Sequence, residues 1–315
     1  MGNYILRRLL LLVPILFGIS VATFVLFRAI PGDVAVIICG QTGSPECLER
    51  VRDQLGLNRP LLVQYTDWVG GIFRGDFGAS MLSHVSLASE LRHRFPVTLE
   101  LLIMTNIIAL ALAIPAGVIS AMRPNTPLDL VVRFLSVLGL SIPNFFLGTL
   151  LILLPLIWFD WTPPLGGYKP FFEDPWTNLQ QFIFPSLALG TAIAAGLMRL
   201  TRSSLLEVMR NDYIRTAWSK GLRERTVVTR HALKNAMIPV VTVLGLYIGG
   251  LMGGTVILEM IFGLPGLGRL ALESILLRDY PIVQGLVLIS ATVFVLVNLA
   301  VDVVYAWFDP RIRYA

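Results

Sequence analysis

The sequence has few charged residues and lacks the motifs of several enzyme classes. Only 14% of its 315 residues are Asp, Glu, Lys or Arg, against about a quarter in ordinary soluble domains, and its mean hydropathy is +0.74. It contains no Gly-x-x-x-x-Gly-Lys-Ser/Thr, and none of its lysines follows a glycine, so the chain has no P-loop for ATP. His-Glu-x-x-His and Gly-x-Ser-x-Gly are also absent, which argues against a zinc or serine hydrolase. We therefore expect a membrane protein that is not itself an enzyme and holds no cofactor.

Six apolar runs, each long enough to cross the roughly 30 Å hydrocarbon core of a bilayer, predict an all-α polytopic membrane protein with six transmembrane helices. They cover residues 9–27, 97–122, 134–158, 182–200, 238–262 and 282–307. The short segments on the side of both termini are richer in Lys and Arg, so we expect both termini in the cytoplasm. The net charge of +5 reflects these segments, and no interleaving of basic and aromatic residues suggests nucleic-acid binding.

The longest polar segment, residues 31–96, would then lie outside the membrane. It is predicted to contain two helices, 45–55 with Ser44 as the N-cap and 64–73. It also contains the only two cysteines of the chain, Cys39 and Cys47. An oxidising compartment would allow a disulfide between them, and two free thiols are the alternative.

The most basic internal stretch lies between the fourth and fifth apolar runs, in the loop 199–237, and its charge places it in the cytoplasm. Asn211 or Asp212 is a suitable N-cap, Lys220 suits the last turn of a helix, and Gly221 suits a left-handed stop. These signals predict a helix of about nine residues, which is too short to be stable alone in water.

This short helix would have two different faces. The apolar face would consist of Tyr213, Ile214, Ala217 and Trp218, and the polar face of Asp212, Arg215, Thr216 and Lys220. Such a helix is suited to dock into a groove on another protein, and a capped helix in a solvated loop is the alternative.

Several strings along the chain match one family pattern. They are D-Y-I-R-T-A-x-x-K-G-L from Asp212, R-H-A-L-K-N-A-x-I-P-V-V-T from Arg230, and L-G-L-N-R-P-L-L-V-Q-Y and R-G-D-F-G-A-S in the segment 31–96. The chain resembles, over its whole length, the bacterial ABC-importer permeases of the peptide, nickel and glutathione branch, and in particular the "B"-type dipeptide permeases. It has Arg215-Thr216-Ala217 where the wider superfamily has Glu-Ala-Ala, so the contact made by that glutamate is absent.

The resemblance implies a membrane-spanning permease subunit of an ATP-driven importer, with the type I fold, in the bacterial cytoplasmic membrane. Its partners would be the lipid bilayer, a second similar permease, two ATP-binding subunits that hold ATP and Mg²⁺, and an external substrate-binding protein. The short helix would be the coupling helix that docks into an ATP-binding subunit. The coupling residues implied by the family pattern are Asp212, Tyr213, Arg215, Thr216, Ala217, Lys220 and Gly221.

On this interpretation residues 1–30 are the N-terminal tail and first span, 31–96 an external segment, and 97–315 the core permease domain. The external segment would be a docking surface for the binding protein or a folded cap over the bundle. The cargo would be a di- or oligopeptide, with glutathione, nickel or a nickel chelate as alternatives. A stand-alone secondary transporter and a membrane-embedded hydrolase are the other classes that remain open.

Polar residues within the spans are candidates for the translocation path. The string Ser-Ile-Pro-Asn predicts a break in the third span and places Ser141 and Asn144 there, although an ordinary kink is the alternative. Asn298 in the last span is a further candidate, and Asp302 is either functional or paired with a loop arginine.

Glycines at four-residue spacing in the fifth span predict close packing between helices in lipid. They are Gly245, Gly249 and Gly253.

Overall fold

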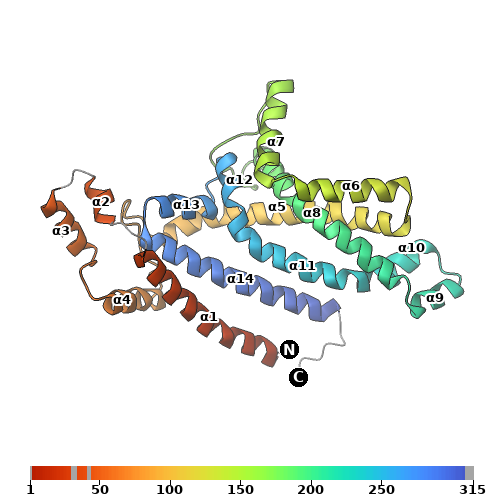
Figure 1. Cartoon of the computed structure of the whole chain (residues 1–315), viewed down its shortest axis with the longest axis horizontal. Helices are drawn as coiled ribbons and strands as arrows, with labels where there is room; N and C mark the ends of the chain where they lie inside the picture. The colour runs from red at the N-terminus through yellow and green to blue at the C-terminus, as the bar shows by residue number, and fades with distance from the viewer. Residues whose placement is uncertain (1, 30–33, 41–43, 309–315) are drawn as a thin grey trace. The chain divides into compact units, whose positions relative to one another are not determined.

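The structure is a computed structural model that describes residues 2–29, 34–40 and 44–308, with side-chain surroundings for 10–29, 35–40, 44–251 and 255–300 (Figure 1). Within these ranges the chain is helical apart from an isolated β-bridge between Ala79 and Ser86. The predicted all-α fold class is therefore confirmed. Asp302 and Gly253 lie outside the residues whose side-chain surroundings are described.

The chain divides into two compact units, and each is described by itself. The core unit contains residues 99–264 and the stretch from 294 onward, and the flanking unit contains residues 2–98 and 265–293. The predicted boundary between the external segment 31–96 and the core permease domain 97–315 stays a prediction.

The core unit contains most of α5, all the helices from α6 to α12, and the second half of α14 (Figure 1). They are α5 (Leu87–Met122), α6 (Pro127–Ser141), α7 (Asn144–Phe159), α8 (Pro175–Val208), α9 (Asp212–Ser219), α10 (Glu224–Thr226), the π-helix η1 (Val227–Ala232), α11 (Leu233–Gly254), α12 (Val256–Ile261) and α14 (Tyr280–Phe308).

Five described helical stretches are long and apolar enough to cross a membrane, and a sixth span results if the bent pair α6 and α7 is counted as one. The pair bends by 100° where the sequence predicted a break. Pro143 cannot donate a backbone hydrogen bond, and Ser141 Oγ donates to the carbonyl of Val137 at 2.8 Å, which satisfies one acceptor at the end of α6.

Helix α8 is the centre of the core unit, where it packs against α6, α7 and α11 (Figure 1). Two of its glycines permit close approach to α5 and α11. A Cβ at Gly190 would lie 3.0 Å from the carbonyl oxygen of Thr105 on α5, and a Cβ at Gly196 would lie 2.7 Å from the hydroxyl of Tyr247 on α11. Glycine therefore lets neighbouring backbones and side chains occupy space that a larger residue would fill.

The predicted glycine face of α11 is partly described. Gly245 and Gly249 are buried, whereas Gly250 is exposed. A Cβ at Gly249 would lie 2.5 Å from a ring carbon of Phe294 on α14, so this glycine accommodates an aromatic side chain of another helix. The role of Gly253 in packing stays a prediction.

The flanking unit contains α1 (Gly2–Ala29), four shorter helices and the remaining parts of α5 and α14. The shorter helices are α2 (Val34–Cys39), α3 (Pro45–Gln54), α4 (Leu61–Phe73) and α13 (Leu267–Leu276). Both helices predicted in the segment 31–96 are present, and Ser44 caps α3 by accepting from the backbone N–H of Cys47 at 3.3 Å.

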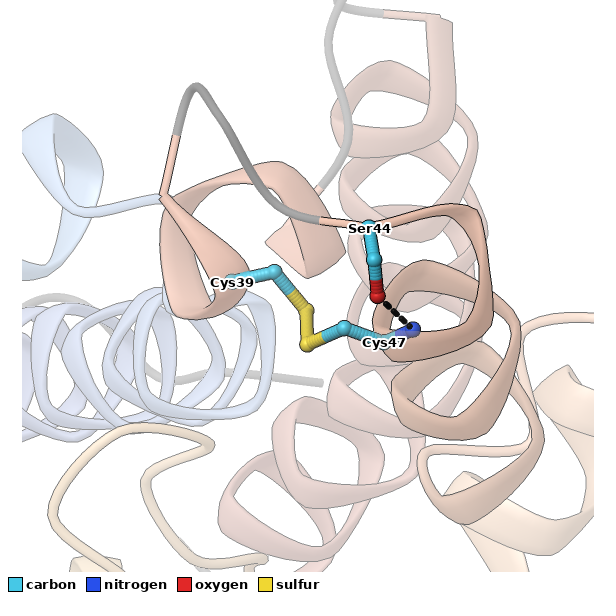
Figure 2. The surroundings of a disulfide bond; sticks show 3 residues. All are labelled: Cys39, Ser44 and Cys47. Carbon is cyan, nitrogen blue, oxygen red and sulfur yellow. Dashed lines mark hydrogen bonds between the residues drawn. A yellow bond between two sulfur atoms is a disulfide. The ribbon is translucent and has the colours of Figure 1, made fainter.

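The two cysteines are joined in this unit. A disulfide connects Cys39 at the end of α2 with Cys47 in the first turn of α3, and their Cα atoms lie 6.1 Å apart (Figure 2). The backbone N–H that donates to the Ser44 cap belongs to the same Cys47, so this residue helps to anchor both the start of α3 and its link to α2 (Figure 2).

Candidate functional site

The candidate site begins with the short helix α9, which follows α8 after a three-residue turn. Asn211 occupies the N-cap position but makes no side-chain capping bond. Its carbonyl instead accepts from the N–H groups of Ile214 at 3.0 Å and Arg215 at 3.2 Å. The predicted side-chain cap is therefore wrong, because main-chain bonds hold the start of the helix while Asp212 places a negative charge in its first turn.

The end of α9 is a Schellman motif around Gly221. This glycine has φ +73°, the left-handed conformation predicted for it. Its N–H donates to the carbonyl of Trp218 at 2.9 Å, and the N–H of Leu222 donates to the carbonyl of Ala217 at 3.4 Å. Leu222 also packs against the core below the helix, as is usual for the residue after such a stop.

Helix α9 is held by a hydrophobic cluster to which five elements contribute. Its buried members are Ala121, Leu205, Ile214, Ala217, Val227, Val228, Ala232 and Ala236. The π-helix η1 supplies three of them, on the segment that leads from α9 back into α11. This cluster provides the tertiary support that an eight-residue helix needs.

The predicted apolar face of α9 is only half buried. Ile214 and Ala217 lie three residues apart on one face and are buried in the cluster. Tyr213 and Trp218 flank that stripe and are 42% and 41% exposed. The structure therefore covers two of the four residues of the predicted apolar face and leaves the two aromatic residues exposed.

The exposed surface of α9 combines these aromatic rings with charge. Arg215 Nη1 lies 3.4 Å from Asp212 Oδ1, and both side chains are largely exposed. Tyr213 is also tied to the start of α11, because Asn235 Nδ2 donates to its hydroxyl at 2.8 Å. The helix thus exposes two aromatic side chains and an ion pair, while its buried side is packed in the hydrophobic cluster.

A buried ion pair between Asp129 and Arg202 lies near the C-terminal end of α8. Asp129, in the first turn of α6, has a fully buried side chain. Arg202 donates to it through Nε at 2.8 Å and Nη2 at 3.1 Å, and the backbone N–H of Asn125 donates at 3.0 Å. Ser120 Oγ on α5 is a fourth donor. The carboxylate therefore joins α5, α6 and α8, and its burial is compensated by charge and hydrogen bonds.

Next to this pair is a cavity of about 650 Å³ between α6, α8 and α11. It is lined by Arg133, Val137, Leu140, Gly196, Arg199, Leu200, Arg202, Ser203 and Tyr247. Three of these nine residues are arginines, so the cavity is both apolar and cationic.

Comparisons with known proteins agree over the full chain. The family described as "Binding-protein-dependent transport system inner membrane component" matches residues 113–314, and the corresponding N-terminal family matches residues 1–102. The chain belongs to this permease family. It is thus a non-catalytic subunit of an ABC importer, a multi-pass inner-membrane protein without a cofactor of its own, and a component that works with an ATPase, a binding protein and a partner permease.

Two curated relatives of the permease cover all of it. A glutathione transport system permease protein of Escherichia coli (strain K12) is 43% identical over 314 residues, with 100% of both chains covered. An oligopeptide transport system permease protein of Bacillus subtilis (strain 168) is 42% identical over 317 residues, again with 100% of both chains covered.

The structure places the seven predicted coupling residues of the permease on or directly after α9. Six of them are exposed: Asp212, Tyr213, Arg215, Thr216, Lys220 and Gly221. Ala217 alone is buried, so in this structure it seats the helix. A coupling role for any of the seven stays a prediction.

The three predicted path residues are not brought together around the cavity of the permease. Ser141 is at the end of α6 and Asn144 at the start of α7, and Asn298 Nδ2 donates within α14 to the carbonyl of Phe294 at 2.9 Å. None of the three is among the residues that line the cavity between α6, α8 and α11. Their role in translocation stays a prediction.

Sequence reasoning missed Asp129 and the cavity arginines of the permease. The available signal was Thr126 three residues before Asp129, a pattern that predicts a helix N-terminus; Thr126 Oγ1 does accept from the backbone N–H of Asp129 at 3.4 Å. The partner Arg202 could not be recognised in this way, because it lies on a helix distant in the sequence.

Proposed function

We propose that this permease is the "B"-type subunit of a heterodimeric importer, that α9 is its coupling helix, and that both termini and α9 lie in the cytoplasm. Two ATP-binding subunits would move the coupling helices on binding ATP, and the bundle would alternate between its two open states. The observation that carries the proposal is the division of α9 into a buried stripe, Ile214 and Ala217, and an exposed aromatic and charged surface. A helix seated on one side and exposed on the other can transmit force without unfolding.

The cargo we propose is a di- or oligopeptide, and glutathione is the alternative. The support is the pair of relatives described above, one of which is an oligopeptide permease and the other a glutathione permease. Because the permeases are similarly related to this chain, the ligand of the external binding protein would decide between the two. Purification of the importer with its binding protein, followed by mass spectrometry of the released ligand, tests the cargo.

The coupling role is tested with substitutions on the exposed surface of α9. In the reconstituted importer, Trp218→Ala and Arg215→Glu should leave the permease in the membrane but lower uptake and binding-protein-stimulated ATP hydrolysis at least about tenfold, as expected when an interface anchor or charge is removed. Arg123→Glu is the matched control, because Arg123 is exposed in the turn between α5 and α6 and belongs neither to α9 nor to the hydrophobic cluster that holds it. Normal uptake in both α9 variants would refute the coupling role.

A further inference from the structure

The cavity between α6, α8 and α11 has the size and the mixed lining of a site for a small organic molecule. Its volume of about 650 Å³ falls in the range of roughly 300–1,000 Å³ that is typical of ligand sites. Val137, Leu140 and Leu200 form an apolar part of the wall. The polar part consists of the three arginines, Ser203 and Tyr247.

Gly196 makes room for the polar part of this wall. A Cβ at position 196 would lie 2.7 Å from the Tyr247 hydroxyl, closer than such atoms approach in proteins. Any side chain at this position of α8 would therefore displace the phenol of Tyr247. The close approach keeps a hydrogen-bonding hydroxyl beside α8, where Arg199 and Arg202 also lie.

The arginines of the cavity are only partly neutralised. In the described part of the chain no acidic side chain lines the cavity, and the nearby Asp129 is already engaged. It accepts both bonds from Arg202, at 2.8 and 3.1 Å, and Arg133 Nη2 lies 3.5 Å from the same carboxylate. Three positive charges around one negative charge leave a surplus of two on the cavity wall.

Arg199 is the arginine of this wall that is free for a ligand. Among the described residues no acidic side chain pairs with it, and its side chain is exposed at the cavity. A guanidinium group offers parallel N–H donors that match a carboxylate in two-point contact. Arg202, by contrast, already donates through Nε and Nη2 to the carboxylate of Asp129.

We propose that this cavity is a carboxylate-binding site for the transported substrate, in which Arg199 holds the carboxylate and the hydroxyl of Tyr247 is a further polar contact. The apolar wall formed by Val137, Leu140 and Leu200 would receive the uncharged part of the molecule. The substrate class is a small organic acid such as a peptide with a free C-terminus, and the inference rests on the importer function proposed above. Arg199 would then favour substrates with a free carboxylate after their release from the binding protein.

The test is equilibrium binding to the purified importer without its binding protein. The probes are trialanine, compared with its C-terminal amide, and glutathione, compared with the derivative in which both carboxyl groups are amidated. Wild-type protein should bind at least one free acid about tenfold more tightly than its amide, and Arg199→Gln should remove that preference, because a charge-assisted two-point contact is lost. Arg123→Gln, which removes the same charge outside the cavity, should bind as the wild type does.

Equal binding of acid and amide by the wild type, unchanged binding in Arg199→Gln, or no binding of either probe would overturn the proposal. ATP-driven uptake of the same peptides by the wild type reports separately on the importer function, so the two failures are distinguishable. A lipid phosphate has similar chemistry and is the competing occupant. If Arg199→Gln reduces the phosphatidylglycerol retained by the importer in nanodiscs while peptide binding is unchanged, a lipid occupies the site and the proposal is wrong.

Discussion

Arg202 and Asp129 lie 73 residues apart in the sequence and form a two-point ion pair, with N–O distances of 2.8 and 3.1 Å. Asp129 is fully buried, and its pairing is what makes a charged side chain acceptable at that position. The pair also defines how α6 and α8 meet, and it leaves Arg199 of the same helix as the cation available to a ligand.

Asp129→Asn should destabilise the permease by roughly 3 kcal/mol, because it leaves the cation of Arg202 without its anion at a largely buried place. The double variant Asp129→Asn with Arg202→Gln should be more stable than the single variant, since no unpaired charge remains. Thermal unfolding in one detergent measures both. A single variant with wild-type stability would show that the pair contributes nothing to the fold.

Ile214→Ala should weaken the packing of α9 against the hydrophobic cluster that holds it. Truncating a buried Ile costs roughly 2–5 kcal/mol, which is enough to open a short helix locally, so amide hydrogen exchange of residues 212–219 should accelerate about tenfold or more. Trp218→Ala is the matched control, because Trp218 is 41% exposed beside the same cluster. The control should keep wild-type exchange while reducing association with the ATP-binding subunit. Equal exchange in the two variants would contradict the described packing of α9.

Gly249→Ala and Gly250→Ala should differ although the two positions are adjacent. A Cβ at Gly249 would lie 2.5 Å from the ring of Phe294, whereas nothing lies within 4 Å of one at Gly250. Overpacking at Gly249 should cost about 1–3 kcal/mol, and Phe294→Leu should recover part of it by making room. Melting temperatures of Gly249→Ala, Gly250→Ala and the double variant Gly249→Ala with Phe294→Leu check this, and equal losses at the two glycines would argue against the contact between α11 and α14.

The raised pKa of Tyr168 predicts that the stability of the permease depends on pH at high pH. This residue lies in the loop between α7 and α8, and its hydroxyl donates to Glu100 at 2.9 Å. Burial, followed by this hydrogen bond, raises the pKa of Tyr168 from 10.0 to about 12. The folded chain therefore holds the proton more tightly than the unfolded chain, and the stabilisation is complete below pH 10 and lost as the pH rises to about 12.

Tyr168→Phe should lose less stability than the wild type over this pH interval, because it has no phenol to titrate. Denaturant unfolding at a series of pH values measures the difference. Parallel pH curves for the two proteins would show that Tyr168 does not keep its proton preferentially in the folded state.

The link between Cys39 and Cys47 should form in protein isolated without reductant. Non-reducing peptide mass spectrometry is expected to find the two cysteine peptides joined, as they are in the structure (Figure 2). Recovery of both as alkylated thiols would contradict this and would also weaken the assignment of residues 31–96 to an oxidising compartment.

Much of the fold was predictable because its signals are local. The apolar runs correspond to the long helices, the cap at Ser44 precedes α3, and the break before Asn144 separates α6 from α7. The left-handed turn at Gly221 was predictable for the same reason. Each of these features depends on residues within one or two turns of each other.

The division of α9 into buried and exposed residues was not predictable in the same way. Tyr213, Ile214, Ala217 and Trp218 are all apolar or aromatic, and their helical spacing is compatible with one face. Only the shape of the cluster formed by other segments decides that Ile214 is covered and Trp218 is not.

The sequence by itself determined that this is a polytopic helical protein of the ABC-importer permease family, because hydrophobic length and short motifs act over neighbouring residues. Only the tertiary structure decided which charges neutralise each other. Asp129 pairs with Arg202, which lies on a helix distant in the sequence. The packing of α6, α8 and α11 forms the cavity, and among the described residues no acidic side chain lines it beside Arg199. Such pairings depend on which helix faces meet, and that is set by the packing of the whole unit.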